Sequence, residues 1–292
     1  MYEKNILLIA YFICSINTYS QQSITIHPFY APDAKYISQT NYKLDLKMKI
    51  AGDSAVLNEL SKMNSSNPLS AHVDISSEIT FNTQKEINGK FKVDAKNHYH
   101  TISQMFNGKK DSSNKTVLLY GSAFTNQLPK YDSVEILPQG HLNDSTKKLL
   151  IKVFQLSSNN ILVSNKSLQI GDTAIMNMRI PLQLPMGFNE NISIKEVFKL
   201  VKIENGLAEF DIVLDGTFDI LGNSQIKLQG KGFCDGSGKC IYNIEKNFFS
   251  YFISDLHFSM PASMNIDDSH RLDVSVDGLM HSMLNTTYQP KH

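Results

Sequence analysis

The clearest hydrophobic pattern in this chain runs from Asn205 to Ile220, where apolar and polar side chains alternate. Even-numbered positions carry apolar residues and one glycine: Ala208, Phe210, Ile212, Leu214, Gly216, Phe218 and Ile220. Odd-numbered positions carry mainly acidic residues: Glu209, Asp211, Asp215, Thr217 and Asp219. A period of two indicates a β-strand with one dry face and one wet face. At about 3.3 Å per residue the strand would extend roughly 45 Å, and Gly216 would let it bend.

The same alternation predicts strands along most of the chain, beginning with an unbroken example at 42–50. Two dipeptides, Asn88-Gly89 and Asn205-Gly206, each separate two strand-like segments. They predict β-hairpins, because both central residues of a type I′ turn need positive φ. The remaining strand-like segments are 71–87, 90–103, 117–120, 133–137, 173–184, 191–204, 226–234, 240–244, 248–260 and 272–276.

One segment has a helical period instead. Residues 144–156 can begin at Asp144 or Ser145 and place a narrow apolar stripe on one face. With so many strands and hairpins, the sequence predicts a mainly β fold of long, curved antiparallel meander sheets, shaped like half a barrel. Inward-facing glycines at 216, 230 and 232 would permit the curvature.

The order of elements in the first half of the chain recurs in the second, with the two Asn-Gly turns 117 residues apart. This favours two related halves produced by duplication, although Asn-Gly pairs also arise by chance in an Asn-rich chain. The predicted divisions are a signal peptide at 1–20, an N-terminal β half at 21–143, a connecting helix at 144–156 and a C-terminal β half with a disulfide hairpin at 157–292.

The N-terminus has the features of an export signal. Lys4 precedes an apolar run over residues 6–16, and Thr18 and Ser20 supply small residues before a cut at Gln21. A buried N-terminal element is the alternative, and Cys14 raises lipidation as another. The run is too short to span a bilayer, and no other segment could cross as a helix. We therefore expect a protein that is secreted or that lies in the periplasm or outer cell envelope.

Export bears on the cysteines, because cleavage would remove Cys14 and leave Cys234 and Cys240. An even number of cysteines in an exported chain favours a disulfide. The five residues between them, Asp235-Gly236-Ser237-Gly238-Lys239, are typical of a hairpin loop. The sequence thus predicts a bridge across that hairpin, with a pair of buried thiols as the alternative.

Few residues suggest catalysis or metal binding. His98 and His100 flank Tyr99 on one predicted strand, but a metal site needs further ligands. The run 267–270 holds two acids, a serine and a histidine in the composition of a turn. The acids of the long strand could bind calcium, but more often such a row is a solvated face that discourages edge pairing. We expect no catalytic residues, no metal and no cofactor.

The large apolar face is the main candidate for a function. One short helix cannot cover all of its members: Phe210, Ile212, Leu214, Phe218, Ile226, Leu228 and Phe258. Either the face is core between the two halves, or it forms a groove for an apolar ligand. Lys and Arg balance Asp and Glu at 28 against 28, so no global field would recruit nucleic acid.

The chain resembles a family of secreted bacterial β-rich proteins of about this length whose function is not established. The resemblance lies in the signal, the Lys-rich strand from Tyr42, the sequence Ile170-Gly171-Asp172-Thr173, and Gly230-Lys231-Gly232. It implies the same β-rich fold and supplies no catalytic residues.

These observations favour an exported, non-enzymatic cell-envelope protein that binds an apolar ligand in a curved sheet or takes part in envelope assembly. A surface or secreted module that binds another protein is the alternative class. A hydrolase is the third, and no nucleophile motif of the Gly-x-Ser-x-Gly type supports it.

Overall fold

The computed structural model describes residues 23–54, 57–58, 67–107, 109–111, 117–125, 133–137, 166–184, 188–221, 228–265 and 271–291. The predicted signal peptide and the predicted helix at 144–156 lie outside these ranges. Among the described residues no helix is long and apolar enough to cross a membrane.

The elements of the described part are β-strands, several of them much longer than is usual in globular proteins. In chain order they are β1 (Ser23–Ile24), β2 (Ala34–Gly52), β3 (Leu69–Thr83), β4 (Phe91–Phe106), β5 (Lys109–Asp111), β6 (Val117–Thr125), β7 (Ser133–Leu137), β8 (Leu168–Gln169), β9 (Thr173–Leu184), β10 (Phe188–Glu204), β11 (Leu207–Leu221), β12 (Leu228–Asn243), β13 (Phe248–Asn265) and β14 (Arg271–Pro290). The mainly β fold predicted from the alternation is confirmed.

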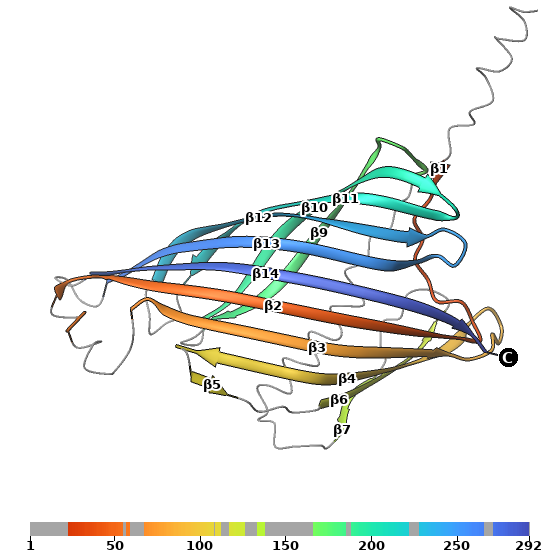
Figure 1. The fold of residues 1–292 in the computed structure, drawn as a ribbon, viewed down its shortest axis with the longest axis horizontal. Helices are drawn as coiled ribbons and strands as arrows, with labels where there is room; N and C mark the ends of the chain where they lie inside the picture. The colour runs from red at the N-terminus through yellow and green to blue at the C-terminus, as the bar shows by residue number, and fades with distance from the viewer. Residues whose placement is uncertain are drawn as a thin grey trace, which may run out of the picture.

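Nearly all strands join one antiparallel sheet of 12 strands, while β1 and β8 pair separately. The sheet runs in the order β7-β6-β4-β3-β2-β14-β13-β12-β11-β10-β9, and β5 pairs with β4 (Figure 1). Strands close in sequence are therefore neighbours, as in a meander, with one exception. The exception is the pairing of β2 with β14, which joins the two halves of the chain at the middle of the sheet.

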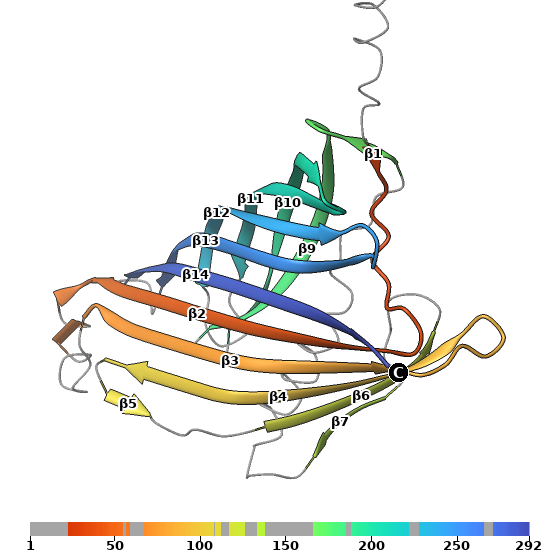
Figure 2. The same ribbon diagram turned by 45° about the vertical axis from the view of Figure 1, so that its right-hand side comes forward.

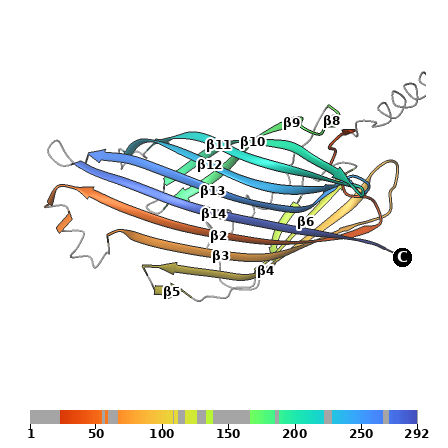
Figure 3. The ribbon, with the colours of Figure 1, turned by 45° about the horizontal axis from the view of Figure 1, so that its top comes forward.

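The sheet is open and strongly curved. Strands β9, β10 and β11 turn away behind β12–β14 (Figures 1 and 2), and on the other side β6 also passes behind the central strands (Figure 3). This confirms the half-barrel shape. Two of the predicted glycines, Gly216 and Gly230, let neighbouring strands come close together, because a Cβ at either position would collide with a carbonyl oxygen of the adjacent strand.

Both predicted Asn-Gly turns form. Asn88 and Gly89 have φ of 53° and 75°, and Asn205 and Gly206 have φ of 51° and 74°. Two successive positive φ values define the type I′ turn, whose twist matches that of paired strands. The two hairpins lie in one continuous sheet rather than in two, and the proposed duplication stays a prediction.

The predicted hairpin at Asp235–Lys239 is wrong, because strand β12 runs without interruption from Leu228 to Asn243. Cys234 and Cys240 are both buried and both free. They lie six positions apart on one strand, which places them about 20 Å apart, whereas the Cα atoms of a disulfide lie within about 7 Å of each other. The predicted disulfide is therefore also wrong.

At the C-terminal end, β14 continues to Pro290 and pairs with β2 as far as Ala34, so the chain stays paired in the sheet beyond Asn285.

We expect Cys234 and Cys240 to be thiols that react slowly in the folded protein. Burial, together with the charges of Asp215 and Asp235, raises the pKa of Cys234 to about 11. Burial and the charge of Glu196 raise the pKa of Cys240 further. Iodoacetamide at pH 8 without reductant should alkylate both at least about tenfold faster in denaturant than in buffer, because thiolate is the nucleophile. Peptide mass analysis that found the two cysteines linked would contradict this.

Candidate ligand-binding face

The buried side chains of the large sheet share one side, here called the inner face. The register carries this side across the central strands: Phe210 lies opposite Cys240, and Phe258 lies opposite Cys234 and Gly278. Of the predicted apolar face, five members are buried here: Phe210, Ile212, Leu214, Phe218 and Phe258. Leu228 begins β12, and Ile226 lies outside the described residues.

Two phenylalanines pack directly over glycines of a neighbouring strand. A Cβ on Gly232 would overlap the ring of Phe218, and a Cβ on Gly278 would overlap the ring of Phe258. Ring and glycine therefore form complementary pairs, in which the absent side chain makes room for the aromatic one. Gly236 and Gly238, which resembled a loop in the sequence, lie against the backbone of β13 within the sheet.

Buried residues of the inner face form two clusters. The large core cluster spans the C-terminal strands, and its larger members include Phe198, Leu200, Phe210, Ile212, Tyr242 and Met260. The small core cluster consists of Ala34, Tyr36, Ile79, Phe81, Phe91, Val93, Ala95 and Phe248. In the latter, the ring of Tyr36 contacts Phe248 and Tyr288 edge-on, at centroid distances of 5.5 and 5.3 Å.

An incompletely buried apolar region lies on the same face, along β2 and its two neighbours. This central apolar strip comprises Tyr42, Leu44, Leu46, Met48, Val73, Ile75 and Met280. Leu44, Leu46 and Met48 pack against the large core cluster yet stay half-buried, and Tyr42 is 41% exposed. Because the members of both core clusters are buried, these half-exposed side chains are a part of the face that an apolar ligand can reach.

Glu196 is a charged residue on this face that the sequence analysis did not single out. It lies in β10 between Met176 of β9 and Leu214 of β11, and it is 3% exposed. Burial raises the pKa of its carboxyl to about 7. Its position could have been found from parity, since Ile194, Phe198 and Leu200 alternate with it as inward residues.

The opposite, outer face is polar and pairs charges across strands. Asp211, considered above as part of a calcium-binding row, lies opposite Lys199 on one side and Lys239 on the other. Asp219 lies opposite Lys231. Opposite charges in facing positions support a solvated, mutually neutralising surface rather than a cation site.

The structure does not bring the other candidate sites together as predicted. A register shift places a bulge at His100, which interrupts the alternation that would have put it on one face with His98. Residues 267–270 lie outside the described residues. In the described part of the chain, no three His, Cys, Asp or Glu side chains come together as metal ligands.

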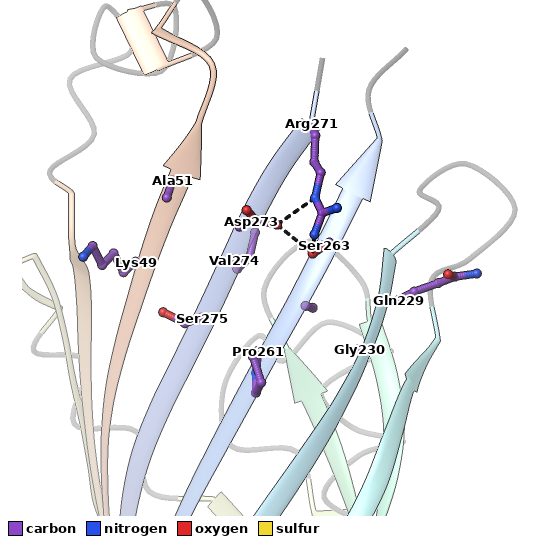
Figure 4. Close-up of a pocket in the computed structure, with 11 residues that line it drawn as sticks. Lys49, Ala51, Gln229, Gly230, Pro261, Ser263, Arg271, Asp273, Val274 and Ser275 are labelled. Atoms are coloured by element: carbon purple, nitrogen blue, oxygen red, sulfur yellow. Dashed lines mark hydrogen bonds and ion pairs between the residues drawn. The ribbon is translucent and has the colours of Figure 1, made fainter. Parts of the chain in front are cut away.

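A pocket of about 480 Å³ lies on the outer face at the ends of β2, β14, β13 and β12 (Figure 4). Arg271 donates hydrogen bonds to Asp273 (3.0 Å) and to Ser263 (2.7 Å), and Ser263 donates to Asp273 (2.6 Å). These hydrogen bonds, from Ser263 first and then Arg271, lower the pKa of the Asp273 carboxyl. Three of the polar side chains that line this pocket thus hydrogen-bond to one another.

No protein-family model matches the chain, and no curated protein matches it. Solved structures similar to it include Aeromonas hydrophila ExeD, with 6% identity, a TM-score of 0.21, and coverage of 98% of this chain and 52% of that one. The InvG secretin domain of the Salmonella SPI-1 injectisome has 8% identity, a TM-score of 0.19, and coverage of 98% and 68%. The Pseudomonas putida toluene transporter TodX has 8% identity, a TM-score of 0.19, and coverage of 93% and 96%.

The chain thus spans about half the length of ExeD. These similarities are too small to assign a fold family or a function.

Proposed function

We propose that this chain is an exported, non-enzymatic protein of the cell envelope that binds an apolar ligand on the inner face of its curved sheet. The observation that carries the proposal is the central apolar strip, where a band of mainly aliphatic side chains beside the buried core clusters stays half-exposed. Apolar ligands bind to surfaces of this kind, because removing such area from water is favourable. Export rests on the signal-like sequence of residues 1–20.

The test is the binding of an uncharged fluorescent probe, N-phenyl-1-naphthylamine, to the wild-type protein and to Leu46→Asn. Leu46 is half-buried in the middle of the strip, opposite Ala71 and Gly278. Loss of its apolar contact is expected to weaken binding roughly tenfold or more. The matched control is Val213→Asn, which removes an apolar side chain that is 57% exposed on the outer face. It should leave binding unchanged.

Circular dichroism should show that both variants are folded. A wild-type protein that does not bind the probe, or equal losses in the two variants, would contradict the proposal. Native mass spectrometry of the purified protein distinguishes the alternative class, since a stable complex with another protein and no bound lipid would favour an interaction module.

A further inference from the structure

A row of small polar side chains crosses the inner face between the two core clusters. Five adjacent strands, β13, β14, β2, β3 and β4, each contribute at least one. The members of this polar belt are Ser254, Ser282, Thr286, Ser38, Thr40, Ser77 and Asn97. Each of them is buried, although its neighbours along the strand on the same face are mostly apolar.

The hydroxyl groups of the belt largely pair with one another. Ser254 faces Ser282 in the register. Ser38 hydrogen-bonds to Thr286 at 2.8 Å, and Thr40 hydrogen-bonds to Ser77. Cross-strand hydroxyl pairs of this kind stabilise a sheet and fix its register.

Asn97 is different. It faces Ile79 of β3 and is 3% exposed, and among the described residues its side-chain carbonyl oxygen accepts no hydrogen bond. Buried acceptors in native proteins almost always have a donor, whether from protein, water or ligand. This position therefore calls for a donor from outside the described chain.

The belt also adjoins the central apolar strip. Along the inner side of β2, the buried hydroxyls Ser38 and Thr40 are followed by half-exposed Tyr42, Leu44, Leu46 and Met48. The strip from Tyr42 to Met48 extends about 20 Å, at about 3.3 Å per residue. Along β2, the inner face thus has a polar segment followed by an apolar segment. This order matches the polar head and apolar chain of an amphipathic molecule.

The polar belt consists of uncharged side chains, and this restricts the head group of the ligand. On the inner face of these five strands the register of the described residues places no Lys or Arg, so these strands supply no counter-ion for a carboxylate or phosphate at Asn97. An unpartnered carbonyl oxygen accepts from an O–H or N–H. Resting on the proposed function, we infer that the face binds a neutral amphipathic lipid whose hydroxyl or amide N–H donates to Asn97, with its chain along the central apolar strip.

The test compares two ligands that differ by one donor, 1-dodecanol and dodecyl methyl ether, as competitors of N-phenyl-1-naphthylamine. The wild-type protein should bind the alcohol roughly three- to tenfold more tightly than the ether, the effect of one hydrogen bond. Asn97→Leu should remove that preference and leave ether binding unchanged. The control Asn41→Leu, on the outer side of β2, should keep it.

Failure of the two proposals is distinguishable. If neither ligand displaces the probe, no apolar ligand binds and the proposed function fails. If both bind equally to the wild-type protein, or if Asn97→Leu keeps the preference for the alcohol, the inference about the belt is overturned while the apolar site stands. Dodecanoate is expected to bind less tightly than the alcohol at pH 8, and tighter binding would also overturn a neutral head group.

Discussion

Phe258→Ala is expected to lower the free energy of unfolding by about 3–5 kcal/mol, the usual effect of removing a buried aromatic ring. Phe258 is 3% exposed, and its ring covers Gly278 on the adjacent strand. Truncation would leave a cavity over that glycine, lined on the other side by β12. Chemical denaturation followed by circular dichroism measures the change. The control Leu279→Ala, at a side chain 45% exposed on the outer face, should cost less than about 1 kcal/mol.

The glycine partner makes this prediction sharper. Gly278→Ala alone should destabilise the protein by about 1–3 kcal/mol, because the new methyl group overlaps the ring and forces it to move. In the double variant the methyl group enters the space that the ring has vacated, so the combined cost should be smaller than the sum. Additive effects would show that ring and glycine do not pack as a pair.

Glu196→Gln is expected to stabilise the protein by up to about 3 kcal/mol at pH 8 and to have little effect at pH 4.5. Burial raises the pKa of Glu196 from 4.5 to about 7, which means that the folded state holds the proton more tightly than the unfolded chain does. The contribution of this residue to stability is therefore largest below pH 4.5 and falls as the pH rises through 7. Glutamine resembles the protonated carboxyl and does not ionise.

The measurement is the difference in unfolding free energy between variant and wild type at the two pH values. The charge of Glu196 also affects Cys240. Burial raises the pKa of the Cys240 thiol, so this thiol stays protonated at both pH values. Glu209→Gln, at an exposed position on the neighbouring strand, is the control and should show no such pH-dependent difference. A destabilising effect of Glu196→Gln at pH 8 would mean that the carboxylate has a partner.

Local chemistry explains what could be predicted from the sequence. Alternation identified the long strands because a buried face and a solvated face leave their mark on every second residue. The Asn-Gly turns were predictable because their φ values depend on two adjacent residues only. The burial of Phe210, Ile212 and Leu214 on one face follows from the same parity.

The errors lie where the deciding contacts are distant in sequence. The segment Asp235–Lys239 has the composition of a loop, yet its glycines adjoin the backbone of the neighbouring strand β13 in a packed sheet. Composition alone cannot distinguish these two uses of glycine. Asn97 and Glu196 could have been recognised in the sequence, because each is a polar residue at a position where the alternation predicts an apolar one. The same pattern also arises where a strand leaves the core, so it does not identify a buried polar residue by itself.

The pairing of β2 with β14 has a consequence for how the chain is made. Ser38 and Thr286, which hydrogen-bond across this pair, are separated by 248 residues. During synthesis β2 emerges among the first strands, and its edge that pairs with β14 stays unpaired until β14 has been made. Such an edge is a template for wrong pairing, and contacts this distant form slowly. Folding that begins only after the whole chain has been released, as it would after transport across a membrane in an unfolded state, avoids that interval.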